Sequence, residues 1–228
     1  MQIAQEARER LKSYMRLILA ENAVINLTSI SDEDDFWEKH IMDSLSLQDW
    51  LPQGASLVDV GTGGGFPGIA LKIARPDLKV SLVESIGKKL RAVERAAAKA
   101  GISGDLEFVC MRAEDAARLP KMREAYDAAA CRALAPLAVA LEWCAGFVRL
   151  GGRVIAMKGP RLFEEIGEAG GCESLLGLSP PKTVGYTLEP SCARRFLAIY
   201  KKTSATPKRY PRQAGAVKKK PLGSAKMP

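Results

Sequence analysis

Apolar residues in the first 50 positions recur at steps of three and four, the period of a helix face. The first such set is Ile3, Ala7, Leu11, Tyr14 and Ile18. Ser31 then precedes a run of acidic residues, as a helix N-cap does. The buried face of a second helix is supplied by Phe36, Ile41, Leu45 and Leu47. We therefore predict that residues 1–50 form a helical cap.

From residue 56 onward, short apolar runs alternate with helical segments. Strands are expected at 56–60, 79–84, 105–110, 126–132 and 151–159, and helices at 66–74, 87–101 and 135–148. Apolar strands joined by helices form a parallel sheet that is covered on both faces. After a short helix at 160–169, two runs at 182–188 and 194–202 predict a closing antiparallel pair. The fold class is α/β and Rossmann-like.

The positive charge of the chain is concentrated at its C-terminus. The 228 residues carry a formal net charge of +8, yet the segment from Lys201 onward holds nine basic residues and no acid. Residues 203–228 are rich in Pro, Gly, Ser and Lys, so we expect a largely disordered tail after a 51–202 catalytic domain. The tail either solubilises the protein or binds a polyanion, and its one-sided charge favours the second interpretation.

Composition also narrows the class of protein. The chain has no run of 18 uncharged apolar residues, and its charged N-terminus does not match a secretory signal, so neither a membrane helix nor secretion is expected. Five cysteines without a CxxC pair indicate free thiols in a reducing cytoplasm. His40 is the single histidine, which argues against a zinc site. Nothing in the sequence reports the oligomeric state, and we expect a monomer.

The stretch GTGGGFPG, residues 61–68, lies between the first strand and the first helix of the domain. Gly61 and Gly63 allow a tight turn and close approach to a ligand, beside the free N–H groups of a helix start. Glu84, at the end of the second strand, can hold ribose hydroxyls. Residues 63–68 also satisfy GxGxxG, so both a dinucleotide and S-adenosylmethionine remain open.

Three features favour S-adenosylmethionine. Asp59 stands two residues before the loop, where an acid can organise it near a cationic sulfonium. The loop has no Lys or Arg to accompany a pyrophosphate. The expected antiparallel pair also closes the sheet, as it does in methyltransferases.

Polar residues follow five successive strands: Asp59 to Gly63, Glu84, Ala113-Glu114, Cys131-Arg132 and Lys158. The carboxyl ends of parallel strands meet at one edge of the sheet, where ligands bind in open α/β folds. We therefore expect these residues to converge on one pocket.

The sequence resembles the 16S ribosomal RNA guanine-N7 methyltransferases. The matching pieces are NLTSI, KHIMDSL, LVDVGTGGGFPGIALKIARPDLKVSLVES, GKK, RAED, CRALAPL and AMKGP, between about Asn26 and Pro160, and later RRFLAIYKK. The resemblance implies a seven-stranded methyltransferase fold with S-adenosylmethionine as cofactor. It implies methyl transfer to N7 of a guanosine in the 530 loop, with 16S RNA or the small ribosomal subunit as partner.

Matching motifs also imply site residues. Contacts with S-adenosylmethionine are implied for Gly61, Phe66, Glu84, Ala113, Glu114 and Arg132. Asp59, Thr62, Gly63 and Gly65 complete the candidate cofactor site. Arg132 and Lys158 are candidate positioning groups in the active site. His40 and Asp43 match family positions without an assigned role.

The residues fit attack by guanine N7 better than two other methylations. Adenine-N6 enzymes carry an Asn/Asp-Pro-Pro-aromatic stretch where this chain reads AACRALAP. Methylation at pyrimidine C5 needs a cysteine nucleophile, and Cys131, without a preceding proline, is interpreted as a packed thiol. Guanine N7 offers an in-plane lone pair and no proton, so alignment suffices and no general base is expected. A bidentate arginine would occupy N7, so Arg132 should face the cofactor, O6 or a phosphate.

Candidate RNA-binding residues are Lys88, Arg91 and Arg95, on one helical stripe with Lys99, and Lys208 and Arg209 in the tail. The stripe is either an ordinary solvated face or an RNA-facing patch. The alternatives left open are a methyltransferase for another RNA or a small molecule, a non-catalytic RNA-binding or ribosome-assembly protein, and, more remotely, a nicotinamide oxidoreductase.

Overall fold

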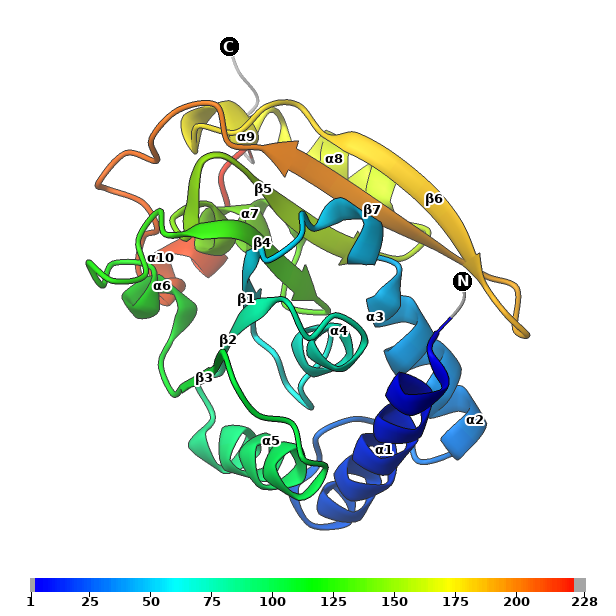
Figure 1. Cartoon of the computed structure of the whole chain (residues 1–228). Helices are drawn as coiled ribbons and strands as arrows, with labels where there is room; N and C mark the ends of the chain where they lie inside the picture. Colours follow the sequence, from blue (N-terminus) through cyan, green and yellow to red (C-terminus); the bar gives the residue numbers. More distant parts are fainter. Residues whose placement is uncertain (1–2, 224–228) are drawn as a thin grey trace.

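A computed structural model of the chain describes residues 3–223 (Figure 1). Its sheet has seven strands in the order β3-β2-β1-β4-β5-β7-β6. Five are parallel: β1 (Ser56–Val60), β2 (Lys79–Val83), β3 (Leu106–Val109), β4 (Tyr126–Arg132) and β5 (Val148–Lys158). The last two, β6 (Lys182–Leu188) and β7 (Ala193–Lys201), form an antiparallel pair, and β7 is also antiparallel to β5. The predicted α/β sheet with its closing pair is confirmed.

Helices cover both faces of the sheet because successive strand residues point to opposite sides. In β1, Leu57 packs into the core under α4 (Gly68–Ala74) and α5 (Gly87–Lys99), whereas Val58 and Val60 pack into the opposite core. That second core lies under α6 (Ala113–Ala116), α7 (Leu137–Ala145), α8 (Leu162–Ala169) and α9 (Cys172–Leu175).

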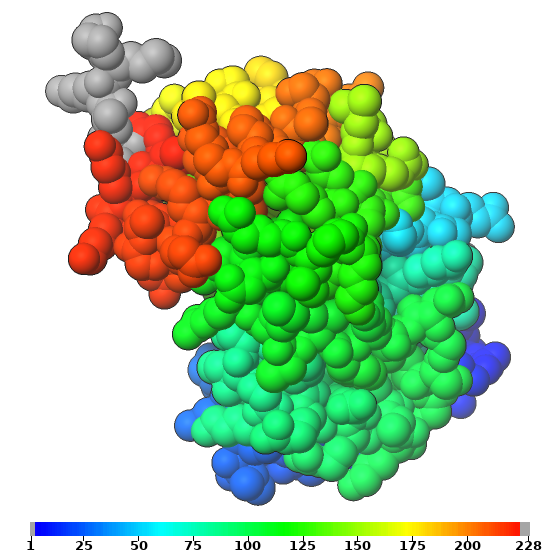
Figure 2. All heavy atoms as spheres, turned by 90° about the vertical axis from the view of Figure 1, so that its left-hand side faces the viewer, coloured from blue at the N-terminus to red at the C-terminus, as the bar shows by residue number. Residues whose placement is uncertain are grey.

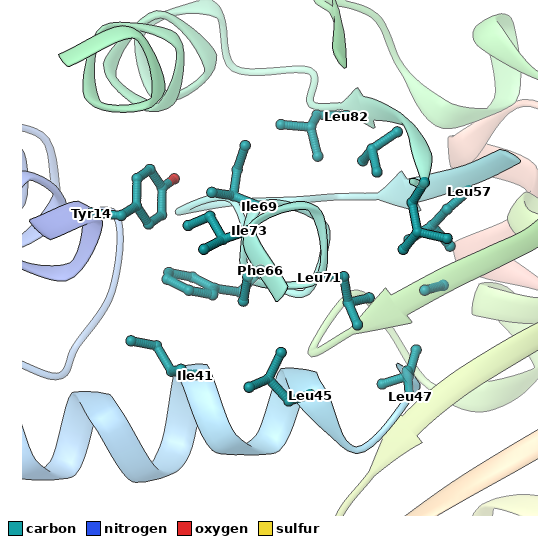
Figure 3. Packing of buried hydrophobic residues seen from close by; sticks show 14 of the residues in the cluster. Tyr14, Ile41, Leu45, Leu47, Leu57, Phe66, Ile69, Leu71, Ile73 and Leu82 are labelled. Atoms are coloured by element: carbon teal, nitrogen blue, oxygen red, sulfur yellow. The ribbon is translucent and has the colours of Figure 1, made fainter. Parts of the chain in front are cut away.

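The N-terminal region is helical and shares the first core. It comprises α1 (Gln5–Ile25), α2 (Glu33–Phe36), a π-helical turn η1 (Trp37–Met42), α3 (Asp43–Leu45) and a 3-10 turn η2 (Gln48–Trp50). Figure 3 shows Tyr14, Ile41 and Leu45 pointing toward Phe66 and the residues of α4. The N-cap of the second helix is Asp32, whose carboxylate accepts from the backbone N–H of Asp35 at 2.9 Å. The prediction of Ser31 as N-cap was therefore wrong by one residue.

The predicted disorder of residues 203–228 is wrong for residues 203–223. This segment lies against the middle of the chain, orange to red against green in Figure 2, and ends in α10 (Ala214–Lys219). Thr206, Tyr210 and Val217 are buried, and Arg212 forms an ion pair with the fully buried Glu142, with Nη2 to Oε2 at 2.6 Å. Arg118 and Arg123 of the domain also donate to backbone carbonyls between residues 206 and 211, so specific contacts hold the segment in place. Residues 224–228 lie outside the described part.

No helix within residues 3–223 combines the length and apolar character needed to cross a bilayer.

Candidate functional site

A cavity of about 890 Å³ opens at the carboxyl ends of the parallel strands. This size suits a small organic ligand. Nine of the predicted site residues line it: Gly61, Thr62, Gly63, Phe66, Glu84, Ala113, Glu114, Arg132 and Lys158. Two predicted residues do not line the cavity: Asp59 is buried beneath the glycine loop, and Gly65 is a buried residue within it. Residues from all five strand ends therefore meet at the cavity, whereas Asp59, Gly65 and Cys131 are buried behind its wall, so the prediction was wrong for the position of these three.

The glycine loop is held against the neighbouring strand by its backbone. The N–H groups of Gly61 and Thr62 both donate to the carbonyl of Val83, at 2.8 and 3.2 Å. Gly61 and Gly63 have positive φ angles of 73° and 55°, a region that favours glycine. No side-chain atom lies within 4 Å of where a Cβ of Gly63 would stand, so its open face belongs to the cavity.

Asp59 organises this loop from beneath. Its Oδ2 accepts from the Thr62 hydroxyl at 2.6 Å and from the Gly68 N–H at 2.8 Å. The side chain is fully buried, and burial raises the pKa of Asp59 to about 6. Its Oδ1 is buried without a hydrogen-bond partner among the described residues.

Two of the predicted carboxylates, Glu84 and Glu114, line the cavity. Glu84 accepts from the N–H of Ile86 at 2.8 Å and of Gly63 at 3.3 Å, so it is fixed at the end of β2. Glu114 is only 4% exposed, and no hydrogen bond to its carboxylate is found within residues 3–223. Since a buried carboxylate is costly without a donor, this wall suits a ligand that offers hydroxyl, amine or cationic groups.

Arg132 is held by the N-terminal helices. Its Nη1 donates to the carbonyl of Lys39 at 2.8 Å and lies 3.3 Å from Asp43 Oδ2, and its Nη2 donates to His40 Nδ1 at 2.7 Å. Its guanidinium carbon also lies 5.6 Å from the centroid of the Phe66 ring. The side chain is 14% exposed, so it presents a fixed positive charge at the cavity wall.

His40 is fixed in one tautomer by this arrangement. Arginine can only donate, so Nδ1 of His40 accepts and Nε2 carries the hydrogen. The Nε2–H therefore donates to the Thr28 hydroxyl, at 2.7 Å. The imidazole stacks on Phe66 with centroids 5.2 Å apart and planes at 12°. Burial, followed by the nearby Arg132, lowers the pKa of His40 to about 3. His40 is therefore neutral at physiological pH, and both its nitrogens are engaged.

Lys158 is fixed as firmly on the other side of the cavity. Its Nζ donates to the Ala135 carbonyl at 2.9 Å and to Glu165 Oε2 at 2.6 Å. The same Glu165 oxygen accepts from the N–H of Leu137 at 2.8 Å. Lys158 of β5 and Glu165 of α8 thus hold the loop after β4 and the start of α7 in place.

The candidate RNA-binding residues lie outside the cavity lining. Lys88, Arg91 and Arg95 are exposed on α5, and Arg95 is engaged by Glu21 of α1, with Nη2 to Oε2 at 2.5 Å. Lys208 and Arg209 are exposed in the C-terminal segment. The cations that do line the cavity besides Arg132 and Lys158 are Lys39, Lys89, Arg112 and Arg195.

Sequence reasoning missed several residues of the site. Tyr186 of β6 donates to Asp43 Oδ1 at 2.7 Å, and Trp143 and Ala214 line the cavity. The motifs NLTSI and KHIMDSL carried a signal for Thr28 and for the helix that holds Arg132. No sequence motif marked Tyr186 or Ala214, because only the folded chain brings these residues to the site. Within residues 3–223, no group of three or more His, Cys, Asp or Glu side chains is arranged to hold a metal ion.

A family profile described as rRNA small subunit methyltransferase G, GidB, matches residues 7–185. The protein named ribosomal RNA small subunit methyltransferase G from Lactobacillus delbrueckii subsp. bulgaricus is 40% identical over 218 residues, 94% of this chain and 91% of the relative. This chain belongs to the GidB family. The protein of the same name from Moorella thermoacetica is 40% identical over 214 residues, 93% of this chain and 89% of that protein. The chain is an S-adenosylmethionine-dependent methyltransferase.

Solved structures support the fold. An O-methyltransferase from Bacillus cereus, in complex with SAH, aligns with a TM-score of 0.59 at 18% identity, over 84% of this chain and 91% of that one. A predicted O-methyltransferase from Agrobacterium tumefaciens aligns with a TM-score of 0.55 at 16% identity, over 74% and 83% of the two chains.

The cavity fits S-adenosylmethionine chemically. Glu84 and Glu114 can accept from hydroxyl and amine groups, the orphaned Asp59 Oδ1 adds negative potential behind the loop, and the loop 61–68 carries no cation that would repel a sulfonium.

Proposed function

We propose that this protein transfers a methyl group from S-adenosylmethionine to N7 of a guanosine in the 530 loop of 16S ribosomal RNA. Membership of the GidB family supports the ribosomal RNA substrate. The choice of N7 as the methylated atom rests on the hydrogen bonding and the pKa of His40, the one histidine of the chain. Both its nitrogens are engaged and its pKa is lowered to about 3, so it is not arranged as a general base.

S-adenosylmethionine supplies an already activated methyl group, so the protein must align the nucleophile and exclude water. Guanine N7 has a free in-plane lone pair and releases no proton on methylation. A site whose histidine does not act as a base is sufficient for this atom, whereas an exocyclic amine must lose a proton.

Pyrimidine C5 chemistry is disfavoured by the position of Cys131. The thiol is 2% exposed, packs in the core beneath α7 and is not among the groups that line the cavity. A cysteine nucleophile must reach the base.

Positioning is assigned to three groups. The glycine loop and Glu84 hold the cofactor. Arg132 places its positive charge beside Phe66. Its Nη atoms already donate to protein groups, so they do not occupy guanine N7. Its remaining N–H groups face a cofactor carboxylate or guanine O6. Lys158 fixes the loop after β4 through Ala135 and Glu165. The exposed Lys88, Arg91, Lys208 and Arg209 add positive potential for RNA. We further propose a cytoplasmic monomer.

The test uses small ribosomal subunits and protein-free 16S RNA from cells that lack this methyltransferase. Purified protein and radiolabelled S-adenosylmethionine should transfer label to 16S RNA in at least one of the two preparations, and RNA from wild-type cells should accept little. Label in a free nucleoside at equal efficiency would favour a small-molecule enzyme. Cofactor binding without transfer to either RNA preparation would favour an assembly protein.

A further inference from the structure

A second surface adjoins the cavity beside α8. Phe163, in the first turn of α8, is 58% exposed. Its ring meets that of Phe196 edge to face, with centroids 5.3 Å apart and planes at 78°. The guanidinium carbon of Arg194, also exposed, lies 5.6 Å from the Phe196 centroid. We call Phe163, Phe196 and Arg194 the Phe163 patch.

The sheet register places this patch at the lip of the cavity. Phe196 of β7 stands directly opposite Lys158 of β5, and directly paired residues of antiparallel strands share a face. Lys158 lines the cavity, so its partner Phe196 lies at the cavity edge on the α8 side of the sheet. Glu165, two residues after Phe163 on α8, lines the cavity as well. Figure 1 shows α8 beside β5 and β7. A strand of RNA that leaves the cavity on this side must therefore cross the patch.

The charges around the patch suit a polyanion. Arg194 and Arg195 have no acidic partner among the described residues. The exposed acid next to Phe163, Glu164, is engaged by Arg161 at 3.1 Å. An exposed aromatic ring beside an unpaired arginine, here Phe163 beside Arg194, is a combination that binds single-stranded nucleic acid, with stacking on bases and electrostatic contact with phosphates.

We propose that Phe163 stacks on the base of an unpaired nucleotide next to the target guanosine, while Arg194 contacts an adjoining phosphate. This inference rests on the proposed function, because a target base in the cavity brings its neighbours to the lip. The patch then positions the RNA strand and contributes nothing to cofactor binding.

The test compares Phe163→Ala, Phe163→Leu and Phe163→Tyr in methylation of whichever RNA preparation the wild-type protein methylates. Leu150→Ala is the matched control, because Leu150 is 63% exposed and lies in β5 away from Lys158. Both Phe163→Ala and Phe163→Leu should lower kcat/KM for RNA about tenfold, the size of one lost base stack. Phe163→Tyr and Leu150→Ala should stay near wild type, and the cofactor Kd should not change in any variant.

Full activity of Phe163→Leu would overturn the stacking role, since leucine keeps the apolar contact and loses only the ring. A parallel loss of cofactor affinity would also overturn it. If the wild-type protein itself transfers no methyl group to either RNA preparation, the proposed function fails first and the patch loses its target.

Discussion

Arg132 shows how a single side chain obtains its role from distant parts of the sequence. Its partners Lys39, His40 and Asp43 lie about 90 positions earlier, and Asp43 is in turn held by Tyr186. The side chain of Asp43 is only 6% exposed, so the ion pair between Arg132 and Asp43 is shielded from solvent. Loss of either partner therefore leaves an uncompensated charge. The neutral His40 fits this arrangement because it can accept from the arginine.

We predict that His40 makes the protein sensitive to acid. Its pKa is about 3 in the folded state and near 6.5 when unfolded. Below pH 6.5 the unfolded chain therefore binds a proton that the folded chain does not, and stability falls as the pH falls. This one group should cost about 2 kcal/mol between pH 7 and pH 5.

His40→Asn is the comparison, because an asparagine oxygen can replace Nδ1 as acceptor and does not titrate. Urea unfolding at the two pH values should show a smaller loss in this variant. Equal losses in both proteins would contradict the neutral, buried imidazole. Asp59 acts in the opposite direction in both proteins, since a raised pKa favours the folded state at low pH.

The open face of Gly63 gives a second prediction at this scale. Gly63→Val places a branched side chain in the cavity and should abolish measurable binding of S-adenosylmethionine in calorimetry. Gly54→Val is the matched control, because Gly54 has a similar φ of 69° and open space around it but does not line the cavity. Each variant carries backbone strain of about 1–2 kcal/mol. Unchanged cofactor binding in Gly63→Val would show that the ligand lies elsewhere.

At the scale of elements, the periodicity of apolar residues was enough to predict the strands and most of the helices. β1 and β4 have the predicted bounds, because buried runs such as SLVDV and YDAAACR have one stable arrangement in a covered sheet. Polar residues at the strand ends also predicted the part of the cavity wall formed by the glycine loop, Glu84, Glu114, Arg132 and Lys158.

The C-terminal segment was not predictable in this way, because its composition is that of a disordered tail. Its order comes from specific partners: Thr206 donates from its N–H to Glu124, and Arg123 and Arg118 donate to carbonyls between residues 206 and 211. Long-range pairings of this kind leave no periodic signal in the sequence.

The ion pair between Arg212 and Glu142 should stabilise this attachment. Arg212→Ala leaves a fully buried carboxylate without its cation, and we expect a loss of about 3 kcal/mol in the free energy of unfolding. Lys218→Ala, an exposed change on α10, should cost less than about 0.5 kcal/mol. Adding Glu142→Gln to Arg212→Ala should recover part of the loss in thermal unfolding. An unchanged melting temperature in Arg212→Ala would show that the segment is not held by this pair.

At the scale of the whole molecule, three regions close the cavity around the sheet edge. The N-terminal helices contribute Lys39, His40 and Asp43, the hairpin β6–β7 contributes Arg195, and the C-terminal segment contributes Ala214. The C-terminal segment therefore forms part of the cavity wall. Deleting residues 203–228 should lower the affinity for S-adenosylmethionine, measured by calorimetry, as well as the affinity for RNA, measured by filter binding.

A base-free reaction predicts a particular pH profile. With RNA and cofactor saturating, the single-turnover rate should vary less than about threefold between roughly pH 6 and 8.5, because no side chain must lose a proton. His40→Asn should keep this flat profile. A steep rise with an apparent pKa near 6.5 that disappears in the variant would identify His40 as a base.

The most direct measurement is to locate the methyl group itself. Unmethylated small subunits, or protein-free 16S RNA, are incubated with the purified protein and S-adenosylmethionine. The RNA is then digested and analysed by mass spectrometry, and strand cleavage at 7-methylguanosine locates the position. We predict one 7-methylguanosine, in the 530 loop of 16S RNA, absent when Gly63→Val replaces the wild-type protein. A methyl group on another atom, on a nucleotide outside that loop, or on no nucleotide at all would contradict the account.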